Sequence, residues 1–206
     1  MLFRSQHQED FFIDHIMKKH GIECEPFFID IGACDGIHLS NTRYFAELGW
    51  GGIFVEPSPH YFPHLEKNYQ HRDDIATVNA AIGSYDDMKA EFYFDAAKPD
   101  HSHLTEEGGN TIVRQLTAHT MLKELGKLKQ GVGVLSIDAE GYDTSILQSI
   151  TGCCGISPTF IIIESNDMDE RRDQIEWLCV THYLLNVFDV NTIWIEKWAW
   201  NNRKIK

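Results

Sequence analysis

The sequence has few positive charges relative to its negative charges. Its 206 residues include 18 lysines and arginines against 31 aspartates and glutamates, which gives a formal net charge of −13. Proteins that bind nucleic acids do so largely through cationic contacts to phosphate groups. The charge balance therefore argues against duplex DNA or RNA as a partner.

Paired cysteines and long apolar runs are absent as well. The five cysteines are odd in number and show no Cys-x-x-Cys spacing, so neither a disulfide framework nor a zinc knuckle is indicated. We expect reduced thiols in a cytoplasmic protein. No apolar run reaches the roughly 18 residues needed to span a bilayer, and the first ten residues lack the apolar core of a signal peptide. These absences predict no stable membrane insertion.

The hydrophobic content of 43% is enough to bury one core, so we expect a single domain over residues 1–206. Residues 1–25 are predicted to form an N-terminal helical extension, with a helix from about His7 to His20 that stops at Gly21. A polar loop at about 96–110 is a candidate lid over a substrate, and disorder is the alternative.

Short apolar strands alternate with helical segments along the rest of the chain. Helices are predicted from about Ser40 to Leu48 and, with Ser58 as the cap, to Tyr69. Strands are predicted at 27–31, 51–56, 75–81, 90–94, 112–116, 132–138 and 160–164, and a terminal hairpin at 183–188 and 192–198. This alternation predicts an α/β fold, in which helices cover both faces of a mostly parallel seven-stranded sheet that ends in an antiparallel hairpin.

The first strand leads directly into a loop of small and acidic residues, Asp30-Ile31-Gly32-Ala33-Cys34-Asp35-Gly36. Glycines let the backbone approach a ligand closely, and the helix that follows points its first amides into the same space. A dinucleotide site has glycine where Asp30 stands, because a carboxylate repels a pyrophosphate. Asp30 and Asp35 instead favour a ligand with positive charge, such as the ammonium and sulfonium groups of S-adenosylmethionine.

Other acidic residues end the following strands, and the carboxyl ends of parallel strands form the ligand crevice. Glu56 follows Asp30 at close to the roughly 20-residue separation at which a carboxylate accepts both ribose hydroxyls. Alone, Glu56-Pro57-Ser58-Pro59 reads as a turn into a helix with a capping serine. Together with the loop after Asp30, it favours ribose binding, and Ala81-Ile82-Gly83 would lie against the adenine ring.

Asp138 and Glu140 follow the strand predicted at 132–138, where a methyl group in transfer should lie. The simpler interpretation is a solvated helix start, because carboxylates are favourable there. Asp138 directly follows an apolar strand, so we expect it to be partly buried and to belong to an active site. His103 is a further candidate for a base that acts near neutral pH.

A second oxygen-rich group, Glu164-Ser165-Asn166-Asp167, follows the strand at 160–164. Asp138, Glu164 and Asn166 together offer the hard oxygen ligands preferred by Mg²⁺ and similar divalent cations, which lower the pKa of a bound hydroxyl. A purely structural role is slightly favoured, in which Glu164 pairs with an arginine such as Arg171 or caps the next helix.

The ordered set of these motifs, together with Ser40-Asn41-Thr42 and Leu48-Gly49-Trp50-x-Gly52, resembles FkbM-type methyltransferases over roughly Phe27 to Lys197. Cys34 stands where the family often has asparagine. The resemblance implies a class I, Rossmann-like fold and an S-adenosylmethionine-dependent O-methyltransferase acting on a hydroxyl of a small molecule, sugar or glycan. It also implies cofactor contacts from Asp30, Gly32, Ala33, Asp35, Gly36, Asn41, Glu56, Pro57, Ser58, Ala81, Ile82 and Asp138, and catalytic roles for Asp138, Glu140 and His103.

Two other functions remain as alternatives. An NAD-dependent oxidoreductase is opposed by Asp30 and by the terminal hairpin, because dehydrogenases usually continue with further βα units. A module that binds S-adenosylmethionine or a nucleotide without turnover has the same sequence features, since a fold does not fix a function.

Overall fold

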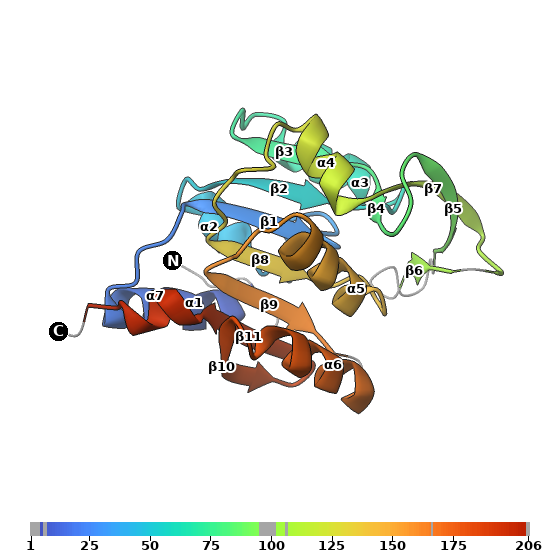
Figure 1. The fold of residues 1–206 in the computed structure, drawn as a ribbon. Coiled ribbons are helices and arrows are strands. Elements are labelled where there is room, and N and C mark those ends of the chain that lie inside the picture. The colour runs from blue at the N-terminus through green and yellow to red at the C-terminus, as the bar shows by residue number, and fades with distance from the viewer. Residues whose placement is uncertain (1–4, 6–7, 95–101, 106, 166, 205–206) are drawn as a thin grey trace.

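The computed structural model describes residues 5, 8–94, 102–105, 107–165 and 167–204. The strands of the main sheet are β1 (Phe27–Ile31), β2 (Gly51–Val55), β3 (Ile75–Val78), β8 (Val134–Ile137), β9 (Phe160–Glu164), β10 (His182–Phe188) and β11 (Asn191–Glu196). Their order is β10-β11-β9-β8-β1-β2-β3 (Figure 1). The pairs from β9 to β3 are parallel, and β11 and β10 add an antiparallel hairpin at one edge. The predicted mostly parallel seven-stranded sheet is therefore confirmed.

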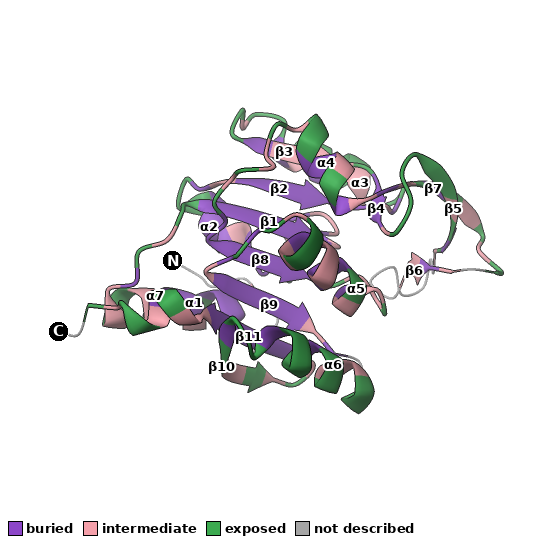
Figure 2. Ribbon diagram, in the orientation of Figure 1, coloured by how far each residue is buried: buried purple, intermediate pink, exposed green. Residues whose placement is uncertain are grey.

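Apolar side chains on both faces of this sheet explain why its central strands are buried (Figure 2). Along β1, Ile29 and Ile31 point to one face and Phe28 points to the other, as the period of two in a strand requires. One face packs against α4 (Ala118–Glu124), α5 (Asp143–Gln148), the π-helix η2 (Ser149–Cys153) and α6 (Met168–Leu178). The other packs against α1 (Glu9–His20), α2 (Arg43–Glu47), α3 (Phe62–Tyr69) and α7 (Lys197–Asn201).

A second, four-stranded sheet projects from the edge of the main body where the parallel strands end (Figure 1). It contains β4 (Ala81–Ile82), β5 (Met88–Tyr93), β6 (His103–Leu104) and β7 (Thr111–Leu116) in the order β4-β7-β5-β6. The single strand predicted at 75–81 is wrong, because the chain leaves the main sheet after Val78 and Ala81–Ile82 pairs with β7. Phe92, Leu104 and Val113 form the small core of this sheet.

The predicted lid at 96–110 is only partly described. Residues 95–101 and 106 lie outside the described residues, and His103–Leu104 form β6, which pairs with β5. This part of the predicted loop is therefore a strand of the second sheet.

Several element ends differ from the sequence prediction for local reasons. Ser58 does not cap α3, because its hydroxyl accepts from the His60 amide in the turn before the helix. The helix begins only at Phe62, which places Pro63 in the first turn, where proline fits. Likewise α2 begins at Arg43 rather than Ser40, whose hydroxyl accepts from the Arg43 amide. The last predicted strand ends at Glu196, and α7 follows directly.

All five cysteines are free thiols. In the part of the chain that the structure describes, no helix combines the length and apolar character needed to cross a bilayer.

Helix α1 is held against the sheet by apolar packing and by a buried hydrogen bond. Ile13 is fully buried against the core, and the carboxylate of the buried Glu9 accepts a hydrogen bond from Asn191 Nδ2 at 2.8 Å. Asn191 opens β11, so this bond joins the beginning of the described chain to the terminal hairpin. A buried carboxylate needs such donors, because an unsatisfied one is costly.

Asn191→Ala should lower the free energy of unfolding by about 1–3 kcal/mol, because it leaves the buried Glu9 carboxylate with one donor fewer. Urea denaturation would measure this change. Asn202→Ala serves as the control, since Asn202 is exposed on the C-terminal side of α7 and should change stability by less than about 0.5 kcal/mol. Equal effects of the two variants would contradict a stabilising role for the hydrogen bond between Asn191 and Glu9.

Candidate functional site

The carboxyl ends of β1, β2, β8 and β9 border a cavity of about 620 Å³. It lies beside β1 and β8, where the order of the parallel strands reverses, which is the expected ligand crevice of such a sheet. Its volume falls within the range of roughly 300–1,000 Å³ that is common for ligand pockets. Phe92 and Leu104 of the second sheet form part of its wall.

Most of the residues predicted to act together do line this one cavity. They come from loops that are far apart in the sequence, and the parallel sheet brings them to one edge. The predicted residues in its lining are Asp30, Gly32, Ala33, Asp35, Asn41, Glu56, Pro57, Ala81, Ile82, His103, Asp138, Glu140 and Glu164.

Three predicted residues do not have this position in the structure. Gly36 lies outside the cavity lining, and its role is packing, since a Cβ there would come within 2.7 Å of both Leu65 and Tyr69 of α3. Ser58 also lies outside the lining, and its amide binds the Glu56 carboxylate. Asn166, a predicted metal ligand, lies outside the described residues.

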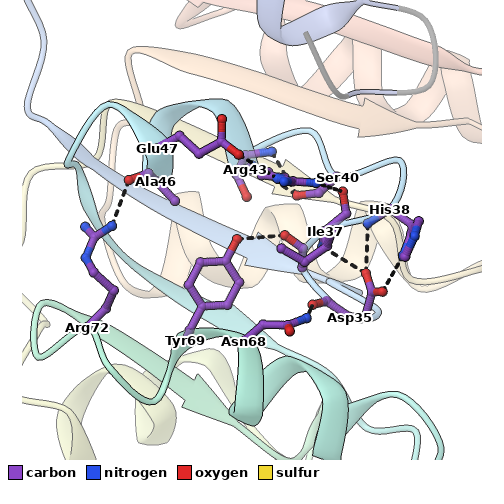
Figure 3. A network of polar contacts seen from close by, with 12 residues as sticks. Asp35, Ile37, His38, Ser40, Arg43, Ala46, Glu47, Asn68, Tyr69 and Arg72 are labelled. Carbon is purple, nitrogen blue, oxygen red and sulfur yellow. Dashed lines mark hydrogen bonds and ion pairs between the residues drawn. The ribbon is translucent and has the colours of Figure 1, made fainter. Parts of the chain in front are cut away.

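Two side chains of helix α3 bind the backbone of the loop after β1 (Figure 3). The Tyr69 hydroxyl donates to the carbonyl of Gly36 at 2.7 Å, and Asn68 Nδ2 donates to the carbonyl of Asp35 at 2.9 Å. Both bonds bind the backbone of the loop, so they fix its path without using any side chain of the cavity.

The Asp35 carboxylate stabilises the turn that follows it. Oδ1 accepts from the amides of Ile37 and His38, and Oδ2 lies 2.5 Å from His38 Nδ1 (Figure 3). Burial alone would raise the pKa of Asp35, but these hydrogen bonds outweigh it and hold the pKa below its usual value. Asp35 therefore lines the cavity as a carboxylate already engaged with its own loop.

Gly32 is required by the close approach of two backbones. Its φ is +81°, and a Cβ at this position would lie 1.7 Å from the carbonyl oxygen of Asp138, which no side chain can occupy. The Asp138 amide in turn donates to the carbonyl of Ile31 at 3.0 Å. The sequence predicted a glycine that makes room for a ligand, and the structure shows one that makes room for the neighbouring loop.

Two buried carboxylates lie at the ends of β1 and β2. Asp30 accepts a hydrogen bond from the Thr42 hydroxyl at 2.5 Å, and burial raises the pKa of Asp30 to about 6. Glu56 accepts from the amides of Cys34 at 2.8 Å and Ser58 at 2.7 Å, and burial raises its pKa to about 7. Glu56 therefore ties the loop after β1 to the loop after β2.

Asn41 lines the cavity and has a buried acceptor. Its Nδ2 donates to Ser136 Oγ at 3.2 Å, whereas its buried Oδ1 has no hydrogen-bond partner among the described residues. A buried carbonyl oxygen without a donor costs free energy, so this position suits a ligand that carries an N–H or O–H group.

Three carboxylates gather at the ends of β8 and β9. Oxygen atoms of Asp138, Glu140 and Glu164 all lie within 4.8 Å of one another. The Asp138 side chain is exposed and lines the cavity, so the partial burial expected from the sequence is wrong. Desolvation by the surrounding protein, followed by the negative charge of Glu164, still raises its pKa well above the usual value. A bound cation would offset the negative charge that gathers here.

The cap of α6 is supplied by Asp167, not by Glu164. The Asp167 carboxylate accepts from the amides of Asp169 and Glu170 at 2.9 and 2.8 Å. The capping role considered for Glu164 is therefore wrong, and the Glu164 side chain lies in the cavity lining instead.

The sequence analysis did not identify Asp143, which binds the backbone of the turn at residues 138–141 after β8, called the acidic turn below. Its side chain is fully buried and accepts from the amides of Ala139 at 3.0 Å and Gly141 at 3.1 Å. The prediction considered only acidic residues at strand ends, whereas Asp143 lies at the start of α5. An aspartate that follows a glycine closely, before an apolar helix, was the available signal.

Comparison with known proteins agrees with this geometry. The family model for the methyltransferase FkbM domain matches residues 30–187, which is most of the chain. No curated protein shows a significant match to the sequence.

Solved structures of methyltransferases share the fold. A methyltransferase FkbM from Methylobacillus flagellatus KT superposes with a TM-score of 0.52 at 10% identity, over 82% of this chain and 42% of that one. An O-methyltransferase from Bacillus cereus, solved in complex with SAH, superposes with a TM-score of 0.50 at 14% identity, over 94% and 82% of the two chains. At these identities the likeness shows the fold alone, and this chain spans less than half of the FkbM structure.

The buried acidic groups predict how stability depends on pH. Asp30, Glu56 and Asp143 have pKa values raised by burial to about 6, 7 and 7, from ordinary values of 3.8, 4.5 and 3.8. Between about pH 4 and pH 7 the folded state therefore holds protons that the unfolded state releases, and the contribution of these groups to the free energy of unfolding falls as the pH rises. Each unit of pKa difference corresponds to about 1.4 kcal/mol.

Asp30→Asn should flatten this pH dependence, because it removes one titrating group and keeps a partner for Thr42. Denaturation of both proteins across the window measures the difference. The comparison with wild type also removes the opposing contribution of His182, whose pKa is lowered by burial. A variant whose stability falls as steeply as that of the wild type would contradict the raised pKa of Asp30.

Proposed function

The chain belongs to the FkbM methyltransferase family, and from this premise we propose that it transfers a methyl group from S-adenosylmethionine to a hydroxyl of a small molecule or saccharide. Membership makes it an S-adenosylmethionine-dependent methyltransferase. The observation that carries the proposal is the convergence of Asp30, Glu56 and Asp138 on one cavity at the strand-order reversal. The acidic lining suits a positively charged methyl donor and disfavours a diphosphate.

The side chains present fit S-adenosylmethionine at three places in the cavity. The Oδ1 of Asn41, which has no partner among the described residues, would accept from the ammonium group of the methionine part, and the Asp30 carboxylate in the same cavity lining would add negative charge. Glu56 would bind the ribose hydroxyls with the lone pairs that the Cys34 and Ser58 amides leave. Ala81 and Ile82 would lie against the adenine ring. The cofactor supplies a methyl group on a positively charged sulfur atom.

Asp138 is the proposed base. Its raised pKa makes it a stronger proton acceptor than an ordinary carboxylate, and its position in the cavity lining beyond β8 supports a role beside the acceptor hydroxyl. His103 of β6 lines the same cavity and is the second proposed base. Most of the acceleration would come from holding the acceptor oxygen in line with the methyl group, as proximity alone supplies a large part of such barriers.

A divalent cation at the acidic cluster is a second part of the proposal. Oxygen atoms of Asp138, Glu140 and Glu164 lie within 4.8 Å of one another, which is close enough for side-chain adjustments to bring them to one ion. Mg²⁺ held there would lower the pKa of the acceptor hydroxyl. Glu140 joins the predicted ligands Asp138 and Glu164, and Asn166 lies outside the described residues.

The wider assignment follows from the sequence. We place the enzyme in the cytoplasm on the strength of its five free cysteines, and its net charge of −13 disfavours duplex nucleic acid as the acceptor. A cofactor-binding module without turnover is the main alternative, and an NAD-dependent oxidoreductase is disfavoured by the family.

Glu56→Gln should weaken S-adenosylmethionine binding by about 10- to 100-fold, because hydrogen bonds to a charged carboxylate are each worth about 1.5–3 kcal/mol. Asp138→Asn should instead lower kcat by about 10²- to 10⁴-fold with nearly unchanged cofactor affinity. Calorimetry gives the affinities, and release of S-adenosylhomocysteine gives the rates. Glu66→Gln, exposed on α3, is the matched control.

Three results would redirect the assignment. Cofactor binding without product on a broad panel of neutral, amino and acidic sugars would favour the binding module. Tight binding of NADH would favour the oxidoreductase, and an unchanged kcat in Asp138→Asn would remove Asp138 from the mechanism.

Removal of divalent cations should lower turnover at least about 10-fold, with recovery on addition of Mg²⁺. Titration of the protein with Mn²⁺ should give one site, weakened in Glu140→Gln and Glu164→Gln, which each remove one ligand. Full activity in the presence of a chelator would remove the metal from the proposal and leave deprotonation to Asp138 or His103.

A further inference from the structure

The acidic turn after β8 is shaped by a residue that does not line the cavity. We propose that Asp143 is a positioning residue for methyl transfer, which holds the Asp138 and Glu140 carboxylates in place by fixing the backbone between them. The inference rests on the proposed function of the cavity, because it assigns the catalytic edge to this turn.

Asp143 accepts two hydrogen bonds from the backbone of the turn. The two carboxylate oxygens bind different amides, Oδ1 that of Ala139 and Oδ2 that of Gly141, so one side chain closes the turn from both sides. The side chain is fully buried and outside the cavity lining, so it does not meet a ligand there. Its effect on chemistry must pass through the backbone.

The turn needs such contacts because its backbone is unfavourable. Glu140 has φ +51° and Gly141 has φ +97°, two successive residues in the left-handed region. A residue other than glycine in this region costs about 1 kcal/mol or more, and it keeps this conformation only where surrounding contacts impose it. The amides that donate hydrogen bonds to Asp143 belong to Ala139 and Gly141, the two neighbours of Glu140.

The other end of the turn is fixed by β1. The Asp138 amide donates to Ile31, and the Asp138 carbonyl occupies the space that a side chain at Gly32 would fill. One end of the turn is thus held by β1 and the other by Asp143, and Asp138 and Glu140 are the acidic residues of the turn that line the cavity. Loss of either anchor would free the turn to adopt other conformations.

Asp143→Asn tests the proposal with little change in volume. The asparagine oxygen can accept from one of the two amides, while its NH₂ group would face the other donor. We expect kcat to fall by about 10- to 100-fold, the usual effect of removing a group that orients catalytic residues, with cofactor affinity within about twofold. Asp86→Asn is the control, because Asp86 also accepts from a backbone amide, that of Thr117, but outside the cavity.

Hydrogen exchange separates this inference from the proposed function. In Asp143→Asn the amide of Ala139 or Gly141 should exchange at least about 10-fold faster than in the wild type, whether or not the enzyme turns over. If Asp143→Asn does not fold, Asp143→Ser keeps one small acceptor for the same two measurements. A lower melting temperature with unchanged kcat and unchanged exchange at both amides would overturn the proposal and leave Asp143 as a simple stabilising residue.

Discussion

The site depends on one close approach between two backbones, where the loop after β1 crosses the loop after β8. The carbonyl of Asp138 lies where the Cβ of any residue but glycine at position 32 would stand. Strands β1 and β8 are in register up to Ile31 and Ile137, so the two loops leave the sheet side by side. This contact brings the loop after β1 and the acidic turn after β8 together at one edge of the cavity.

The acidic residues brought together in this way are costly to the isolated protein. Asp30, Glu56 and Asp143 are all buried, and burial raises each pKa toward neutrality. Backbone amides and the Thr42 hydroxyl offset part of this cost. A positively charged ligand would offset more of it, which links the electrostatics of the cavity to the charge of the proposed methyl donor.

The sequence was sufficient to predict the main sheet and much of the cavity. Apolar strands such as Phe27–Ile31 and Phe160–Glu164 have an unambiguous pattern, and an acidic residue at or just beyond such a strand must lie at its carboxyl edge. Asp30, Glu56 and Glu164 were found in this way. Glu140 joined them because the turn after β8 is short.

What the sequence did not predict depends on contacts between distant segments. The second sheet arises because Ala81–Ile82 pairs with β7, a choice that no local pattern expresses. The packing role of Gly36 depends on Leu65 and Tyr69, and the Ser58 amide binds Glu56 across the turn that precedes α3. Asp143 escaped notice for the same reason, since its partners lie on the turn before its own helix.

The side chain of Tyr142 connects the second sheet to the acidic turn by packing. This side chain packs against the main core and also against the small core of Phe92, Leu104 and Val113, and it lines the cavity between them. It lies between Gly141 and Asp143, so the residue next to the acidic turn also packs against the second sheet. The second sheet supplies Phe92, His103 and Leu104 to the cavity wall, and the turn supplies Asp138 and Glu140. The two parts of the wall therefore share the packing of one side chain, that of Tyr142.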